Sequence, residues 1–286
     1  MPIAVENVSY TYLPGTPFEH QALKNVSFTI EDGEFVGIIG HTGSGKSTLI
    51  QIISSLIPQT AGRVLIDGVD YSQKDADKKK LRRTVGVVFQ YPEYQLFEET
   101  IAKDIAYGPR MTGIPEEELE NRTQVAMELV GMDYETYKDK SPFELSGGQK
   151  RKIAIAGVLA MEPKILIMDE PIAGLDPLGR ESLMDLVKNL NDCGMTILMI
   201  SHNMDGLAEY ASRILVMNQG ELMMNGTPRE VFREHEALRA AGLDLPEAGQ
   251  LVEALRAKGI AISEENIRFD EVKEELIRML GGKAHD

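Results

Sequence analysis

The chain has 286 residues, 43% of them hydrophobic and 26% charged, a globular composition with room for one large domain and an appendage. Lys and Arg number 30 against 45 Asp and Glu, and the resulting net charge of −15 argues against broad binding to nucleic-acid phosphates. One cysteine, Cys193, excludes an internal disulfide framework. No apolar run approaches the ~20 residues that cross a bilayer, so we expect no membrane-spanning helix. The first ten residues lack a basic region followed by an apolar stretch, so we expect no signal peptide.

Short apolar runs, typical of strands, recur along the chain. Residues 3–12, 26–30 and 63–66 favour half-buried strands, which we expect to pair antiparallel. The fully apolar runs favour buried strands of a second sheet and cover residues 35–39, 85–89, 165–168 and 196–200. Because helical patterns separate these buried strands, the sequence predicts an α/β fold.

A glycine-rich loop follows the strand predicted at 35–39 and leads into a helical stretch at 49–56. Its G-x-x-x-x-G-K-[ST] pattern between strand and helix is that of a phosphate-binding loop. The backbone N–H groups and the helix N-terminus attract an anion, Lys46 adds a charge near the β- and γ-phosphates, and Ser47 can ligate Mg²⁺. The predicted nucleotide-binding residues of this loop are Gly40, His41, Thr42, Gly43, Ser44, Gly45, Lys46, Ser47 and Thr48.

A helical block interrupts the strands between about residues 92 and 160. We expect helices over 100–107, 115–130 and 147–159, the second opened by Pro115. A sheet core interrupted in this way predicts an inserted helical subdomain.

Two carboxylates end the strand predicted at 165–168. At the carboxyl end of a strand in an α/β sheet, such groups line the ligand crevice. We expect Asp169 to hold Mg²⁺, directly or through water, and Glu170 to act as the general base for an attacking water.

The C-terminal residues 236–286 differ from the rest of the chain in their pattern of apolar and polar residues. Helices are expected over 248–258 and 264–280, the second ended by Gly281 and Gly282. Because the segment has few apolar positions, we expect a helical extension that packs on the main domain or on a partner.

The start of the helix predicted at 147–159 resembles the signature motif of ATP-binding cassette (ABC) ATPases, and the matching residues are Leu145, Ser146, Gly147, Gly148 and Gln149. In that family the motif reaches the γ-phosphate bound by a second subunit. The resemblance therefore implies catalysis by a dimer.

Three further residues match the family in order. Gln90 resembles the Q-loop glutamine, which contacts the nucleotide and its Mg²⁺, and Asp176 ends a segment like the D-loop. His202 matches the switch histidine, which senses the γ-phosphate and joins Lys46 and Glu170 in catalysis. The resemblance covers about residues 1–235 and implies an ABC nucleotide-binding domain with an N-terminal antiparallel β subdomain.

An aromatic residue early in the chain stacks on adenine in this family. We select Tyr12, with Tyr10 and Phe18 as competitors. The guanine-reading N-K-x-D motif does not occur in the sequence, so the expected ligands are ATP and Mg²⁺.

Residues 89–97, 12–19 and 154–161 resemble the ATPases of energy-coupling factor (ECF) importers, in the second of their two types. The resemblance implies a peripheral subunit on the cytoplasmic face of the cell membrane that drives uptake of vitamins or transition-metal ions. The implied partners are a second ATPase subunit, a transmembrane coupling protein and membrane-embedded substrate-binding proteins. A heterodimer is favoured over a homodimer, the C-terminal extension would contact the dimer partner, and no nucleic acid is involved.

The segment after Gln90 mixes aromatic and acidic side chains. We expect it to dock a membrane partner, with Tyr94 and Phe97 as anchors, Tyr91 beside them, and Glu93 as an acceptor for basic side chains. The alternative is that Tyr94 and Phe97 pack inside the helical block.

Other readings of the ABC match remain open. The main rival is an ordinary ABC importer with a dedicated permease and a solute-binding protein. A soluble ABC protein acting on ribosomes or DNA fits poorly, because the chain has one cassette, no long insertion and an acidic balance. A non-hydrolysing regulatory subunit would have a damaged motif, whereas these motifs are complete.

Overall fold

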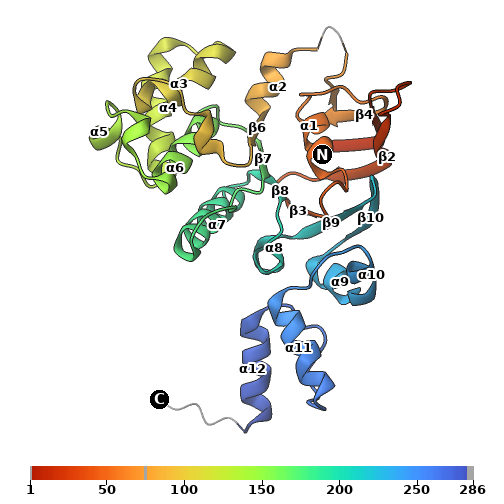
Figure 1. Cartoon of the computed structure of the whole chain (residues 1–286). Helices are drawn as coiled ribbons and strands as arrows, with labels where there is room; N and C mark the ends of the chain where they lie inside the picture. Colours follow the sequence, from red (N-terminus) through yellow and green to blue (C-terminus); the bar gives the residue numbers. More distant parts are fainter. Residues whose placement is uncertain (1, 74–75, 282–286) are drawn as a thin grey trace.

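A mostly parallel six-stranded sheet forms the centre of the computed structural model, which describes residues 2–73 and 76–281 (Figure 1). Its strand order is β10-β9-β3-β8-β7-β6, and only the edge pair β10–β9 is antiparallel among the described residues. The strands are β3 (Phe35–Ile39), β6 (Val85–Val88), β7 (Ile165–Asp169), β8 (Thr196–Ile200), β9 (Arg213–Asn218) and β10 (Glu221–Gly226). The four predicted buried strands are confirmed, and β3 and β8 are buried at every residue.

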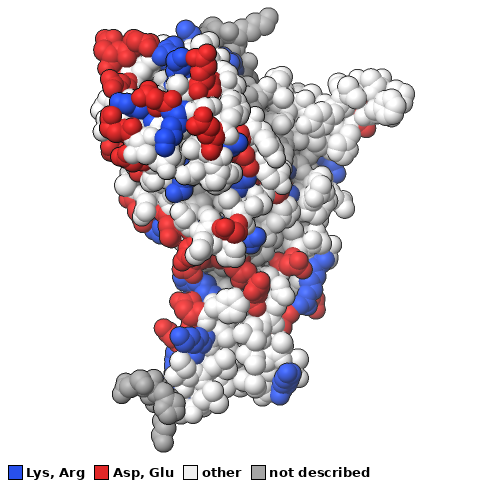
Figure 2. All heavy atoms as spheres, turned by 60° about the vertical axis from the view of Figure 1, so that its left-hand side comes forward, with Lys and Arg blue, Asp and Glu red and all other residues white. Residues whose placement is uncertain are grey.

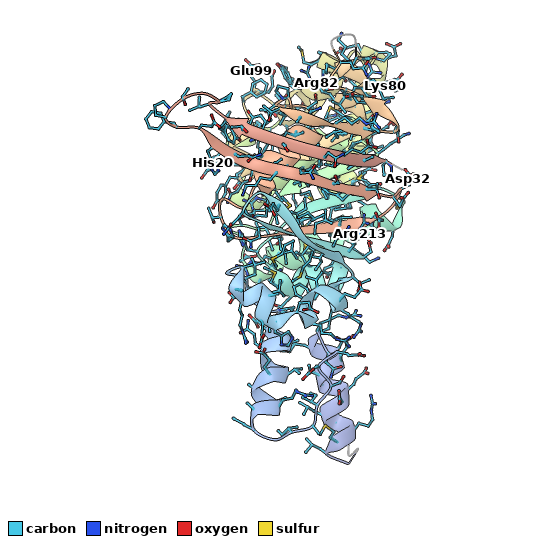
Figure 3. All side chains as sticks on the ribbon, turned by 90° about the vertical axis from the view of Figure 1, so that its right-hand side faces the viewer. His20, Asp32, Lys80, Arg82, Glu99 and Arg213 are labelled. Atoms are coloured by element: carbon cyan, nitrogen blue, oxygen red, sulfur yellow. The ribbon has the colours of Figure 1, made fainter. Side chains whose placement is uncertain are left out.

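A second, antiparallel sheet stands at the N-terminus with strand order β2-β1-β4-β5. Its strands are β1 (Ile3–Tyr12), β2 (His20–Ile30), β4 (Ala61–Ile66) and β5 (Val69–Asp70). β2 begins earlier than the predicted residue 26, because its pairing with β1 continues up to Tyr12 opposite His20. The tip of this hairpin projects from the body above His20 in Figure 3 and stands out almost free of charge at the upper right of Figure 2.

The helix that follows the glycine-rich loop, α1 (Lys46–Ile53), packs its apolar side between the two sheets. It begins and ends three residues earlier than the predicted 49–56, since Gly45 is already its N-cap. A short helix, α2 (Lys78–Thr84), then leads into β6. Its N-cap, Asp77, accepts hydrogen bonds from the backbone N–H groups of Lys79 and Lys80.

A block of helices packs beside the β6 edge of the central sheet, at the left of Figure 1, and carries a dense mixture of both charges at the upper left of Figure 2. It contains η1 (Pro92–Gln95), α3 (Ile101–Thr112), α4 (Glu116–Leu129), α5 (Tyr134–Tyr137), η2 (Pro142–Glu144) and α6 (Gly147–Leu159). The prediction for α3 was too short: the helix continues through Pro109 because Pro109 and Thr112 are buried on its inner face. Arg83 stabilises the C-terminal end of α3 by donating to the carbonyl of Thr112.

The strands β9 and β10 are absent from the sequence predictions. They form a hairpin whose turn residues, Gln219 and Gly220, both have left-handed backbones, with φ 48° and 83°. Two-residue hairpin turns use this conformation, and Asn-Gly is its usual sequence. The Gln-Gly sequence therefore gave a weak turn signal, although the run from Ile214 to Met217 is fully buried.

The connecting and C-terminal helices are α7 (Pro177–Asp192), α8 (Met204–Tyr210), α9 (Pro228–Arg233), α10 (His235–Ala240), α11 (Glu247–Ala257) and α12 (Phe269–Met279). The last two stand side by side and project away from the body (Figure 1). Their shared core is small, as expected, and consists of Ala248, Val252, Ile262 and Val272. α12 begins at Phe269 rather than 264, because Ile267 turns inward against α8 and α9; the predicted stop at Gly282 lies outside the described residues.

Within the described ranges, no helix is both long and apolar enough to span a membrane.

Candidate nucleotide site

The glycine-rich loop connects β3 to α1 by an unusual backbone path. Gly43 and Gly45 have φ values of 83° and 103°, which side chains disfavour. A Cβ on Gly45 would lie 2.7 Å from the carbonyl oxygen of Ala22, and one on Gly40 would lie 2.4 Å from that of Met217. Strands β2 and β9 therefore press on the loop so closely that only glycine fits at these two positions.

Lys46 lies inside this loop and is only 7% exposed. Its Nζ donates to the carbonyl oxygens of Gly40 at 2.5 Å and His41 at 3.1 Å. Burial lowers the pKa of Lys46, although the carboxylates of Glu170 and Asp169 oppose this shift. A poorly hydrated ammonium surrounded by backbone dipoles interacts strongly with an anion.

Ser44 supplies a test of whether a phosphate fits the loop. Its Oγ is buried and has no hydrogen-bond partner within the described part of the chain. A buried hydroxyl without a partner is costly, and an anion's oxygen would satisfy it. The loop residues thus fit a phosphate ligand.

Asp169 ends β7 and lies beside Ser47, whose hydroxyl hydrogen-bonds to its carboxylate. Burial and the neighbouring charge of Glu170 raise the pKa of Asp169, and Ser47, Lys46 and His202 offset part of that shift. A carboxylate and a hydroxyl are the oxygen ligands that Mg²⁺ prefers. This pair therefore fits the cation that accompanies a nucleotide.

The raised pKa of Asp169 gives a stability prediction. A folded-state pKa above the unfolded value of ~4 means that this carboxyl lowers the free energy of unfolding as the pH rises through that range. We expect Asp169→Asn, without Mg²⁺ or nucleotide, to raise the thermal midpoint at pH 7 but not at pH 3.5. Differential scanning calorimetry against pH checks this, and a lower midpoint at pH 7 would contradict it.

Glu170 follows the end of β7 and meets residues at the ends of β6 and β8. Its backbone is left-handed, with φ 49°, and its N–H donates to the carbonyl of Ile200 in β8. His202 Nε2 lies 3.1 Å from Oε1, and Gln90 Nε2 lies 3.4 Å from Oε2. Glu170 and His202 also line a cavity of about 460 Å³, so water can reach the carboxylate.

Tyr12 lies against α1, the helix that follows the phosphate loop. Its hydroxyl is 3.2 Å from Thr48 Oγ1, and its ring meets Tyr10 edge-on at 4.7 Å. Phe18 lies at the hairpin tip and is 79% exposed. Tyr12 thus contacts the last residue of the predicted phosphate loop, whereas Phe18 is exposed at the hairpin tip.

Replacing Tyr12 with Ala should raise the KM for ATP by roughly tenfold, the effect of losing about 1–2 kcal/mol of base stacking. The kcat should change little, because no reacting atom is touched. Steady-state kinetics with Phe18→Ala as the matched control checks this. An equal loss for Phe18→Ala and none for Tyr12→Ala would reverse the assignment.

The signature-like residues cap a helix that faces outward. Ser146 and Gln149 form a reciprocal capping box at the start of α6, and space beyond Gly147 and Gly148 is open. Leu145 is buried beneath them. The positive end of α6 is thus exposed at the surface of the chain.

Comparisons with known proteins place this geometry in a family. The model of the ABC transporter family matches residues 23–173. The energy-coupling factor transporter ATP-binding protein EcfA2 of Clostridium perfringens (strain 13 / Type A) is 54% identical over 281 residues, which cover 98% of this chain and 99% of that protein. The protein of the same name in Clostridium acetobutylicum is also 54% identical, with 98% of each chain covered. This chain belongs to the energy-coupling factor transporter ATP-binding proteins.

Solved structures of ABC proteins are also similar to this chain. The cbiO1 protein of Clostridium perfringens, described as part of the ABC transporter complex cbiONQ, has a TM-score of 0.73 and 39% identity, covering 88% of this chain and 98% of that one. The ATP-binding cassette MJ0796, solved as a dimer bound to ADP and Pi, has a TM-score of 0.69 and 32% identity, covering 79% and 98%. The predicted ABC ATPase fold and the ECF resemblance, in its second type, are confirmed.

The structure also shows where the residues predicted for the D-loop and for docking lie. Asp176 is the N-cap of α7, accepting a hydrogen bond from Gly179 N–H at 2.7 Å. Tyr94 and Phe97 are 83% and 57% exposed, so the alternative that they pack inside the helical block is wrong. Tyr91 is 40% exposed and lies beside Tyr94.

The expectation for Glu93 needs correction. Its carboxylate is largely buried and forms a two-pronged ion pair with Arg151 of α6, so it is not free to receive a partner's basic side chain. Arg151 was not among the residues predicted from the sequence. No motif signalled this pairing, because the two residues are 58 positions apart.

Proposed function

We propose that this chain is the ATP-hydrolysing subunit of an importer of the energy-coupling factor type. It would form an ATP-dependent dimer with a second, related ATPase on the cytoplasmic face of the membrane, its C-terminal extension contacting that subunit. One observation carries the proposal. The residues for phosphate, Mg²⁺ and water converge at one sheet edge, while the positive end of α6 faces outward, where it can complete another subunit's site.

Each residue has a defined task in this proposal. Lys46 and the loop N–H groups hold the β- and γ-phosphates of ATP. Ser47, Asp169 and Gln90 would hold Mg²⁺, which neutralises charge on the phosphates when bound. Glu170 accepts a proton from the attacking water, and His202 orients the Glu170 carboxylate and contacts the γ-phosphate.

The docking of a transmembrane coupling protein is assigned to the surface after Gln90. Tyr94 and Phe97 form an exposed aromatic pair there, and the ring of Phe97 meets Tyr107 edge-on at 4.9 Å. A cavity of about 340 Å³ has mostly apolar walls, which include Leu56, Leu81, Phe89, Met111 and Met161, with Lys78 and Arg82 also lining it. Phe89 directly precedes Gln90. A movement of Gln90 caused by the γ-phosphate would therefore shift the surface on which a partner is bound.

Replacing both Tyr94 and Phe97 with Ser should reduce recovery of the coupling protein at least tenfold, because exposed aromatic anchors dominate such interfaces. ATP binding should not change. Quantitative co-purification from membranes measures this, with Val125→Ser as control, since Val125 is an exposed apolar residue of α4. Full recovery of the partner by the double variant would remove this surface from docking.

Purification of the tagged chain from its native membranes in mild detergent tests the proposed function. Recovery of a second related ATPase, a multi-spanning coupling protein and small membrane proteins that bind vitamins or metal ions supports it. A single permease with a solute-binding protein would instead indicate an ordinary ABC importer. Recovery of neither would contradict a role in transport.

A further inference from the structure

Arg151 is a buried cation that none of the steps above uses. It lies in α6 and is only 4% exposed. Its guanidinium donates to both carboxylate oxygens of Glu93, with Nε–Oε2 at 3.0 Å and Nη2–Oε1 at 2.8 Å. Its Nη1 donates to the carbonyl oxygens of Pro171 at 3.1 Å and Ala173 at 2.8 Å.

Arg151 and its partners belong to three separate functional segments. Glu93 lies in η1, which follows Gln90 and carries the docking surface. Pro171 and Ala173 belong to the turn that follows Glu170, where Ala173 N–H donates to the carbonyl of Glu170 at 3.1 Å. Arg151 itself belongs to the helix whose first turn is the signature motif.

Tyr91 closes the same junction from another side. The guanidinium carbon of Arg151 lies 5.9 Å from the centre of the Tyr91 ring. The ring also borders Gly174, since a Cβ there would lie 3.5 Å from Tyr91 Cε1. The segment after Gln90 and the segment after Glu170 are therefore held against one side chain.

The chemistry of this junction requires arginine. A buried ion pair is stable only when its hydrogen-bonding groups are satisfied, and the planar fork of Arg can bond a carboxylate with two donors while a third serves carbonyls. Burial acts to raise the pKa of Glu93, but the hydrogen bonds from Arg151 and a backbone N–H outweigh it and lower that pKa. Lysine would keep the charge and lose the fork.

We propose that Arg151 and Glu93 are positioning residues that connect the two ATP sites of the dimer, an inference that rests on the proposed function. The N-terminus of α6 acts on ATP held by the other subunit, whereas Glu170 acts on ATP held by this chain's own loop. The bonds to Pro171 and Ala173 tie the turn of Glu170 to α6. A shift of α6 at one site therefore moves the general base at the other.

The test compares Arg151→Lys and Glu93→Gln with wild type, in the complex purified with its partner ATPase. Both variants should keep the KM for ATP within about twofold, because the phosphate loop is untouched, and lose roughly tenfold to hundredfold in kcat from misplacement of Glu170. The Hill coefficient for ATP should fall from above one in wild type to one. The matched control is Arg122→Lys, since Arg122 bridges Glu118 and Glu162 in the same helical block.

The outcomes separate the two levels of inference. Unchanged kcat and Hill coefficient in both variants would contradict the proposed coupling through Arg151 and Glu93 and leave the ATPase assignment intact. A raised KM with unchanged kcat would also overturn it, by placing the pair in nucleotide binding. Where Arg151→Lys fails to fold, Glu93→Gln decides, because it preserves size. A wild-type complex without ATP hydrolysis would instead contradict the proposed function.

Discussion

Replacing Lys46 with Met is expected to weaken ATP binding about 100-fold, because charge-assisted hydrogen bonds contribute about 1.5–3 kcal/mol and each 1.4 kcal/mol is tenfold in affinity. Lys46 lies within reach of two loop carbonyls and is the buried cation of the phosphate loop. Hydrolysis should fall in parallel, since the β- and γ-phosphates lose the charge that holds them. Isothermal titration with Mg·ATP measures the affinity.

The same variant should not unfold the protein. Burial lowers the pKa of Lys46, so the charged form is disfavoured in the folded state and costs stability at neutral pH. Without nucleotide, Lys46→Met should therefore match or exceed the thermal midpoint of wild type. Lys24→Met is the control, because Lys24 is partly exposed and pairs only loosely with Glu221, at 3.8 Å. Equal ATP affinity in Lys46→Met and wild type would contradict the assignment of the loop.

The sequence could predict those parts of the site that lie in contiguous motifs. Gly40 to Thr48 form one strand–loop–helix unit, whose conformation follows from glycine positions and the helix start. The meeting of Glu170 and His202 was predictable as well. Each follows a buried strand, β7 and β8 are parallel neighbours, and their carboxyl ends meet at one edge of the sheet.

Features that depend on packing between distant segments could not be predicted. Glu93 was assigned to a partner because an acidic residue in a polar helical turn usually faces water. Its counter-ion comes from a helix 58 residues away, and no local pattern announces it. In the same way, α3 continues past Pro109 because the end of the helix is buried. The β9–β10 hairpin depends on a Gln-Gly turn, which is an atypical turn sequence.

Replacing Glu170 with Gln should reduce kcat by roughly 10²–10⁴-fold, the usual contribution of a general base, while Mg·ATP binding is retained. The amide keeps the size of the side chain, so the left-handed backbone and the contact with His202 Nε2 can persist. It cannot accept the proton that the attacking water must lose. A time course of phosphate release measures the loss of kcat, and titration with Mg·ATP measures the retained binding.

The retained binding has a second consequence that distinguishes a base from a structural residue. If ATP closes the dimer and hydrolysis reopens it, Glu170→Gln should accumulate as an ATP-bound dimer, which size-exclusion chromatography with light scattering detects. Glu181→Gln is the control, because Glu181 is an exposed carboxylate of α7. Unchanged kcat would exclude Glu170 as the base. Lost ATP binding would instead mean that the carboxylate shapes the site, because a base that acts only on water contributes nothing to ground-state affinity.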